Sequence, residues 1–331
     1  MIVGQERAVE QFAMAWASRK LHHAWLLAGP KGVGKASFAD AAARRVLAEA
    51  AGPAFDLPGI ETPAEHAIVK LIEAGSHPDM RRLERLVNEK TGNLARSISV
   101  DQVRELGEFM ALTPALSAWR VVVLDTVDAL ETSAANALLK MLEEPPANTL
   151  FFLVSHAPGR LLPTIRSRCR KLDFHPLDDD AMTAILDAEA PNLASAERQR
   201  IIATSFGSAG RALAFAELDL ARIEDASVAI LRQGDPTNAR RSELALELGK
   251  KGAAERYAAF LELAPSLIAR EARTLDGPGR ERAVDAYAKA RELAAIAPRL
   301  SLDPSATVFQ IGGILADVAV GRGAGSASLK R

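Results

Sequence analysis

Hydrophobic and polar positions form two kinds of run along this chain, and their order predicts an α/β region followed by helices. Continuous apolar runs are typical of strands buried on both faces, whereas apolar residues that recur every three or four positions are typical of amphipathic helices. Apolar runs of this kind predict buried strands at 25–27, 121–125 and 149–155, the second of them ending in a carboxylate. The expected helices are 5–19, 36–51, 101–112 and 133–144, and two weaker strands are expected at 80–87 and 171–174. This alternation predicts a doubly wound α/β domain that binds its ligand at the carboxyl ends of the strands.

Strand patterns stop after Pro176, and helical periodicity continues to about residue 320. Short helical segments are expected first and longer alanine- and leucine-rich helices from about 222 onward. We therefore predict four parts: an α/β domain over 1–176, a small helical lid over 177–220, an all-α oligomerisation domain over 221–320 and a disordered tail over 321–331. The tail is rich in Gly, Ser and basic residues.

Composition excludes several classes of protein. The 331 residues carry 41 Lys and Arg against 42 Asp and Glu, so the chain has no overall basic character for binding nucleic acid by itself. A single cysteine, Cys169, allows neither an internal disulfide nor a zinc site made of cysteines, and the histidines show no ligand spacing. No apolar run approaches the roughly 18 residues of a membrane helix. We expect a soluble cytoplasmic protein with no membrane partner.

A glycine-rich segment follows the first apolar run and carries the clearest chemistry. Gly29, Gly32, Gly34 and Lys35 match the phosphate-binding pattern G-x-x-x-x-G-K, with a strand before it and a helix after it. Such a loop turns backbone N–H groups toward one point at a helix N-terminus, and its lysine reaches the outer phosphates of a nucleotide. A glycine turn without a ligand is the alternative.

Two positions needed for hydrolysis lack the expected side chains. The pattern next requires a Ser or Thr hydroxyl for Mg²⁺, but this chain has Ala36, and Ser37 points roughly 100° away on the helix. Asp125 ends a buried strand beside the loop, where it could hold Mg²⁺ or be a plain strand-end carboxylate. In hydrolysing NTPases with an Asp-Glu pair, the next residue is the glutamate that activates water, but here it is Thr126. We expect Asp128 to lie outside the site. We therefore predict binding of ATP or ADP with Mg²⁺ weak or absent, and poor hydrolysis or none.

Several arginines are candidates for function. Arg168 follows a Leu-Pro-Thr-Ile turn at the rim of the α/β domain, where it could complete a neighbouring subunit's phosphate site or form a surface ion pair. Arg211 begins a helix of the expected lid, and it could contact a nucleotide or lie in solvent. The arginines of the polar strand are expected to form a solvated face: Arg81, Arg82 and Arg85.

Seven segments together resemble one family, the delta-prime subunits of the bacterial DNA polymerase III clamp loader, which are AAA+ proteins. They are Ile2–Gln5, His22–Trp25, Gly29–Lys35, His77–Asp79, Ile98–Arg104, Ser133–Pro146 and Leu162–Cys169, and the likeness ends near Gly207–Leu213. The block LLKMLEEPP and the Ser-Arg-Cys motif at 167–169 are specific to clamp loaders. The resemblance covers about two thirds of the chain. Many family members carry four zinc-binding cysteines that this chain lacks between 52 and 75, so no zinc is expected.

The resemblance implies a fold and a set of partners. It implies an AAA+ domain, a lid and a collar through which subunits form a ring that places the sliding clamp on primer-template DNA. It also implies that Arg168 is an arginine finger directed in trans at the adjacent subunit's ATP, that Ser155 lies near the sensor-1 position and that Arg211 is at sensor 2. The chain would then be a non-catalytic subunit of a DNA polymerase holoenzyme. A gamma/tau-like motor ATPase is the first alternative, and a small-molecule P-loop kinase is the second.

Overall fold

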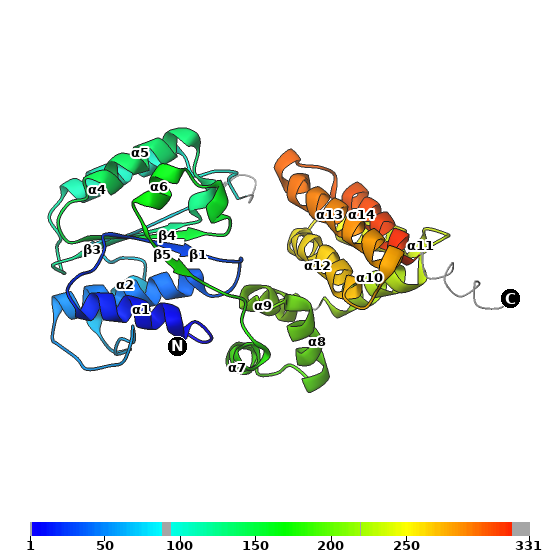
Figure 1. Cartoon of the computed structure of the whole chain (residues 1–331), viewed down its shortest axis with the longest axis horizontal. Helices are drawn as coiled ribbons and strands as arrows, with labels where there is room; N and C mark the ends of the chain where they lie inside the picture. The colour runs from blue at the N-terminus through cyan, green and yellow to red at the C-terminus, as the bar shows by residue number, and fades with distance from the viewer. Residues whose placement is uncertain (1, 88–93, 219, 320–331) are drawn as a thin grey trace. The chain divides into compact units, whose positions relative to one another are not determined.

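The computed structural model describes residues 2–87, 94–218 and 220–319, and their contacts divide the chain into two compact units, Met1–Ala181 and Met182–Arg331 (Figure 1). The predicted tail lies outside the described residues. The strands are β1 (Ala24–Ala28), β2 (Met80–Glu84), β3 (Arg120–Asp125), β4 (Thr149–Ser155) and β5 (Arg170–Asp173). The helices of the first unit are α1 (Glu6–Ala17), α2 (Lys35–Ala51), α3 (Ala67–Glu73), α4 (Val100–Ala111), α5 (Thr132–Glu143) and α6 (Pro163–Ser167).

The five strands form one parallel sheet in the order β2-β3-β4-β1-β5. Strands β1 and β4 are buried along their whole length, and β3 is buried up to its last residue, as their continuous apolar sequences predict. Although β2 follows β1 in the chain, β1 pairs with β4 on one side and with β5 on the other. The order of the strands therefore reverses beside β1. Ligands of doubly wound sheets bind at the carboxyl end of such a point.

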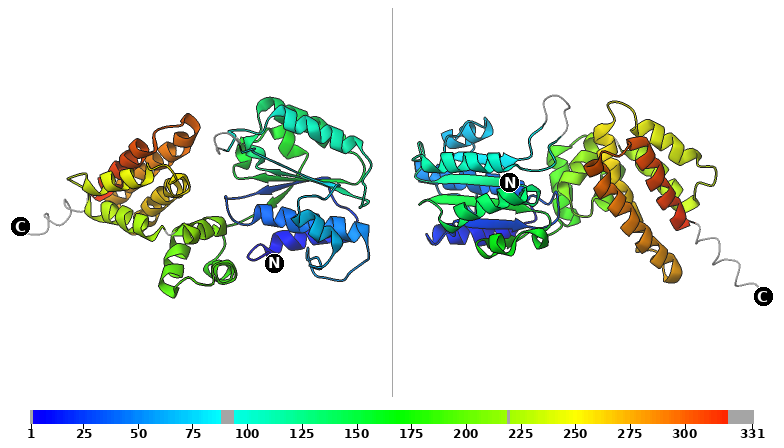
Figure 2. Two further views of the ribbon diagram at one scale, coloured as in Figure 1. Left: turned by 180° about the vertical axis from the view of Figure 1, so that it is seen from behind. Right: turned by 90° about the horizontal axis from the view of Figure 1, so that it is seen from above.

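Helices cover both faces of this sheet (Figures 1 and 2). One face packs on α1 and α2 through an aromatic cluster in which Phe12 lies 5.2 Å from Trp25 and 5.9 Å from Phe38, measured between ring centroids. The other face packs on α4 and α5 through aliphatic residues. Helix α4 begins at Ser99, whose hydroxyl accepts the N–H of Gln102 while the Gln102 side chain accepts the N–H of Ser99. The predicted α/β fold is confirmed.

The second unit is helical throughout its described residues, as predicted. Its helices, with α7 crossing the boundary between the units, are α7 (Asp179–Glu189), α8 (Ser195–Ser205), α9 (Ala209–Glu217), α10 (Ala221–Gln233), α11 (Ala239–Leu248), α12 (Ala254–Ala272), α13 (Gly277–Leu300) and α14 (Pro304–Ala319). Helices α8 and α9 contact α12, so the segment predicted as a lid packs within the same unit as the longer helices. Its division into lid and collar stays a prediction. Across the described ranges, no helix is both long and apolar enough to span a membrane.

Candidate functional site

The glycine loop lies between β1 and α2, where close packing requires glycine. A Cβ atom on Gly29 would lie 2.2 Å from the carbonyl oxygen of Phe174, so no other residue fits there without moving the backbone. Gly34 has φ 96° and caps α2, whose first residue is Lys35. Gly32 also has positive φ, at 77°. The loop therefore has the strand–loop–helix geometry that a phosphate group requires.

Lys35 lies within this loop and not in solvent. Its side chain is buried, and its Nζ donates to the carbonyl oxygen of Gly29 at 2.7 Å and also to that of Pro30. Burial lowers the pKa of Lys35 to about 8, against the charges of Asp128 and Asp125, which raise it. An anion in the loop would stabilise the protonated, charged form of Lys35, which burial disfavours. This lysine is therefore placed to bind phosphate oxygens.

Asp125 does not offer an unpaired carboxylate at the end of β3. Its Oδ2 lies 3.3 Å from Nη1 of Arg82, and Nη2 of Arg82 forms a second ion pair with Asp40 on α2. The expectation that Arg82 belongs to a solvated face is therefore wrong. Arg81 and Arg82 are successive residues of β2, so their side chains leave opposite faces of the sheet, and that of Arg82 reaches the face covered by α2. One guanidinium thus forms ion pairs with two carboxylates beside the loop.

This arrangement does not fit a bound Mg²⁺. Ala36 supplies no hydroxyl, and the carboxylate that would hold the ion is ion-paired to a fixed cation. Within residues 2–87, 94–218 and 220–319, no three His, Cys, Asp or Glu side chains are grouped so that they could hold a metal ion.

Asp128 belongs to the site, contrary to the expectation from sequence. It lies in the short 3₁₀ turn η1 (Val127–Ala129), and its Oδ1 accepts the hydroxyl of Ser155 at 2.7 Å. Its Oδ2 accepts the backbone N–H of His156 at 2.5 Å. Asp128 therefore fixes the end of β4 next to Lys35. The turn after β3 brings Asp128 back to the ends of the strands, a return that the sequence alone gave no reason to expect. The role of Ser155 as a nucleotide contact stays a prediction.

His156 is a site residue that sequence reasoning missed. Burial lowers its pKa, and the positive charge of Lys35 lowers it further, whereas Asp128 and Asp125 raise it. Its Nε2 lies 3.4 Å from the hydroxyl of Thr126. One feature of the sequence could have identified His156 as a site residue: it directly follows a buried strand, and the carboxyl end of that strand lies beside the glycine loop. A neutral imidazole here can act as a hydrogen-bond partner without adding charge.

Gln5 joins the N-terminal segment to the loop. Its buried side-chain amide donates to the carbonyl oxygen of Val33 at 3.1 Å and to that of His175 at 2.8 Å. The loop is thereby attached to the segment that leaves β5.

Arg168 lies at the end of α6, partly exposed. Its Nη2 forms a 2.6 Å ion pair with Glu143 of α5, and its Nη1 donates to the carbonyl oxygen of Thr164 at 3.0 Å. The two blocks with clamp-loader character in the sequence therefore meet in this pair. Ion pairs this exposed contribute about 0–1 kcal/mol, so the side chain can leave Glu143 at little cost.

Arg211 lies in the second unit, where it binds α12. Its Nη1 donates to the hydroxyl of Ser266 at 3.0 Å, and its Nε lies 3.5 Å from Glu262. The role of Arg211 at a nucleotide stays a prediction.

Comparison with known proteins identifies the family of this chain. The family model described as DNA polymerase III, delta subunit, matches residues 4–178, which is more than half of the chain and includes the whole site around Lys35. The chain belongs to this family. The resemblance to clamp-loader delta-prime subunits is confirmed with it, and the parallel sheet and the glycine loop lie within the matched residues.

Relatives of this DNA polymerase III family show how far the similarity extends. The DNA polymerase III subunit delta′ of Pseudomonas aeruginosa is 43% identical over 147 residues, which are 44% of this chain and 41% of that protein. The subunit tau of Bacillus subtilis is 31% identical over 235 residues, 68% of this chain and 39% of that protein. The match therefore spans about two fifths of each relative's length. The structure of a DNA polymerase III gamma-subunit-related protein from Thermotoga maritima is 19% identical, with a TM-score of 0.44 over 94% of this chain and 99% of that one.

Proposed function

We propose that this chain is a delta-prime-like clamp-loader subunit that binds ATP or ADP without a tightly held Mg²⁺ and does not hydrolyse ATP. The observation that carries the proposal is the ion pair between Arg82 and Asp125, because it places a fixed cation where a hydrolysing site needs a metal. Ala36 and Thr126 support it, since one removes a metal ligand and the other removes the water-activating carboxylate. Gly29, Gly32, Gly34 and Lys35 would hold the phosphates.

The proposed contribution to catalysis is made in trans by Arg168. A guanidinium can hold two phosphate oxygens and stabilise the charge that develops as the γ-phosphoryl group leaves. Arg168 lies on the rim, and Glu143 holds it by a partly exposed ion pair that a neighbouring nucleotide could replace. In this proposal Glu143 holds the Arg168 side chain against α5 until a neighbouring subunit's nucleotide replaces Glu143 as its ion-pair partner.

The proposed partners are the other subunits of a clamp-loader ring. The relatives are named as DNA polymerase III subunits, which implies an assembly. The helices of 221–320 would supply the contacts between subunits, and the sliding clamp and primer-template DNA would be contacted through the assembly.

An active motor is the competing function, and the match to a tau subunit over 68% of this chain is the observation in its favour. The motor predicts ATP turnover by the isolated chain. It also predicts nucleotide affinity that falls when EDTA removes Mg²⁺. The proposed role predicts neither, so titration calorimetry with and without EDTA, together with an ATPase assay of the purified chain, separates the two functions.

The trans role is tested in a reconstituted clamp loader. Arg168→Ala should leave assembly intact and lower the DNA- and clamp-stimulated ATPase, by up to about 10³-fold at the one site it serves and by less for the whole complex. Arg168→Lys should not restore activity, because an ammonium keeps the charge but loses the planar fork. Arg166→Ala is the matched control, since Arg166 is an exposed arginine of the same helix. Wild-type ATPase and clamp loading with Arg168→Ala would remove this role.

A further inference from the structure

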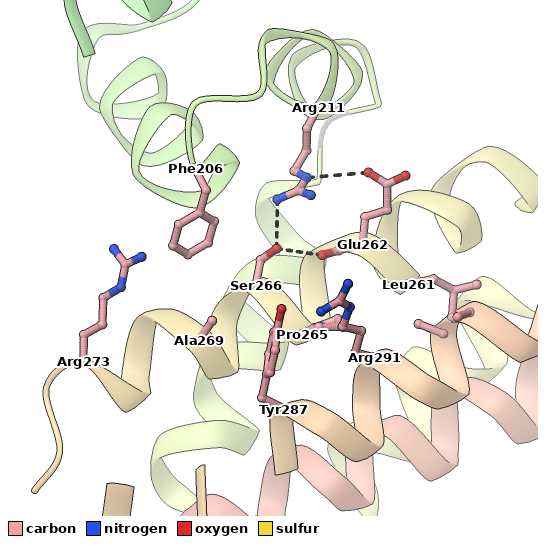
Figure 3. A pocket seen from close by; sticks show the side chains of 12 residues that line it. Phe206, Arg211, Leu261, Glu262, Pro265, Ser266, Ala269, Arg273, Tyr287 and Arg291 are labelled. Carbon is pink, nitrogen blue, oxygen red and sulfur yellow. Dashed lines mark hydrogen bonds and ion pairs between the residues drawn. The ribbon is translucent and has the colours of Figure 1, made fainter. Parts of the chain in front are cut away.

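The second unit contains a pocket of about 450 Å³ that has no part in the site around Lys35 (Figure 3). Helices α12 and α13 form its floor, and the α8–α9 segment contributes Phe206 and Arg211. Most of the remaining wall is apolar, including Leu261, Pro265 and Ala269. Its volume falls within the roughly 300–1,000 Å³ of small-molecule sites.

The charged side chains around this pocket are mainly cationic. Arg211, Arg273 and Arg291 line it, with Glu262 as the one carboxylate among the lining residues. Arg211 is held in place by Ser266 and Glu262, as described above. Arg291 is exposed on α13 and has no ion pair or hydrogen bond to any other residue that the structure describes. The pocket therefore has positive charge that the chain itself does not neutralise.

Two aromatic rings complete the pocket. Phe206 ends α8 in the left-handed region, with φ 48°, and the guanidinium of Arg273 lies over its ring at 5.1 Å from the centroid. Figure 3 shows the rings of Phe206, which directly follows α8, and of Tyr287, in α13, directed into the same space. A left-handed phenylalanine costs backbone energy, which is tolerated where the ring position is needed.

We propose that this pocket binds a phosphate monoester attached to a planar ring, the chemistry of a nucleotide. A terminal phosphate offers three oxygens and up to two negative charges, so it can accept from more than one of the three guanidinium groups. In this proposal the base lies against the aromatic rings and the apolar wall, and the Glu262 carboxylate accepts a hydrogen bond from a base amine or a sugar hydroxyl. A carboxylate offers only two oxygens and one charge, which leaves part of the cationic lining unmatched, so an acidic peptide fits less well.

The two tyrosines of the chain provide a readout specific to this pocket. Tyr287 lines the pocket and Tyr257 does not, and the first unit contains no tyrosine. In protein labelled with 3-fluorotyrosine, 2′-deoxyadenosine 5′-monophosphate should shift the ¹⁹F resonance of Tyr287 in a saturable way and leave that of Tyr257 unchanged. Binding in the glycine loop moves neither resonance directly, and a Lys35→Ala background removes that site from the titration.

Variants of the arginines test the proposed ligand. Arg291→Ala and Arg273→Ala should each weaken the titration about tenfold, as expected for loss of a charged hydrogen-bonding partner. Arg299→Ala is the matched control, because it is an exposed arginine of α13 outside the pocket, and it should change the affinity less than twofold. Arg291→Lys should recover part of the affinity, which distinguishes contact with the ligand from damage to the fold.

Three further titrations identify what the pocket recognises. Deoxyadenosine, which lacks the phosphate, should not bind at concentrations that saturate the monophosphate. A short deoxyoligonucleotide with a 5′-phosphate, compared with its 5′-hydroxyl form, distinguishes the end of a strand from a free nucleotide as the source of the phosphate, and either source supports the proposal. The proposal is overturned if the Tyr287 resonance does not shift with the monophosphate, if Arg291→Ala titrates like wild type, or if an acetylated Asp-Phe-Glu amide binds more tightly than the nucleotide.

Discussion

Arg82 gives the sharpest test of the proposal that the site holds no Mg²⁺ tightly, because removing this side chain should create a site for the ion. In the wild type, one guanidinium is ion-paired to both Asp40 and Asp125. Arg82→Ala leaves these two partly buried carboxylates close together without a cation. We expect the variant to be less stable than the wild type and to recover stability when Mg²⁺ is added, whereas the wild type should not respond to Mg²⁺.

The size of the effect follows from the geometry. Unit charges 3.3 Å apart interact by about 5 kcal/mol at an effective dielectric constant of about 20, which is an upper limit before desolvation and side-chain entropy are subtracted. The side chains of Arg82 and Asp125 are 29% and 24% exposed, so we expect a net loss of about 1–3 kcal/mol. In a unit of this size that loss lowers Tm by about 3–9 °C. If Mg²⁺ binds the two carboxylates with a Kd of about 1 mM, 10 mM Mg²⁺ restores about 1.4 kcal/mol.

Thermal unfolding with and without 10 mM Mg²⁺ measures both effects. Arg81→Ala is the matched control, since Arg81 lies beside Arg82 in β2 but contacts the Phe109 ring and a backbone carbonyl group. It should neither lose comparable stability nor respond to Mg²⁺. Adding Asp125→Asn to Arg82→Ala should abolish the response to Mg²⁺. The reasoning fails if Arg82→Ala and the wild type respond to Mg²⁺ alike.

Three further predictions follow from the structure. Because burial lowers the pKa of Lys35 to about 8, nucleotide affinity should fall as pH rises from 7 to 9.5, with proton uptake on binding measurable by calorimetry in two buffers. The Lys35→Arg variant should show a flat profile over this range, and an equal slope in both proteins would contradict the assignment. Glu143→Gln should change stability by less than about 1 kcal/mol in denaturant titrations, since the pair is partly exposed, and should leave loader ATPase at least at the wild-type level. A chain ending after Ala181 should stay folded by circular dichroism but fail to join the loader on size exclusion, and normal assembly would exclude a collar role for the second unit.

The sequence predicts the scaffold of the site well, because the signals for it are local. The predicted strand at 149–155 has the observed bounds, and the glycine loop occupies the expected place between β1 and α2. A strand with a continuous apolar sequence is stable only when both of its faces are buried. At position 29 only glycine fits, because the chain passes so close to Phe174. Such features depend on a few neighbouring residues.

The ion pairs of the site could not be predicted from local sequence signals. Arg82 lies 42 residues after Asp40 and 43 residues before Asp125 in sequence. The three meet only because β2 lies next to β3 and α2 packs against the same face. One signal was present, since Arg81 and Arg82 are successive residues of a strand and cannot share one solvated face. Asp128 was missed for a related reason, because the turn after β3 brings it back to the strand end.

Arg211 shows a different limit. Its proposed role came from the position it occupies relative to a family motif, and such a position identifies a helix but not the direction of a side chain. In the structure the guanidinium contacts Ser266 and Glu262, more than fifty residues later in the chain. Periodicity predicted that both segments were helical but not that they would pack together.

The ion pairs of Arg82 with Asp40 and Asp125 have a consequence for how a nucleotide would act in the proposed subunit. A Mg²⁺ ion bridges the β- and γ-phosphates and moves with them, so a metal-dependent site distinguishes ATP from ADP and changes state on hydrolysis. A guanidinium held by Asp40 and Asp125 is fixed to the protein and cannot follow the phosphates. A nucleotide held only by the loop, by Lys35 and by the N-terminus of α2 would then stabilise the domain. Its binding would not control any step of the ATPase cycle. In the proposed ring, the first unit would keep the same state throughout the ATPase cycle, and Arg168 would respond to hydrolysis because it would act on a nucleotide that another subunit binds.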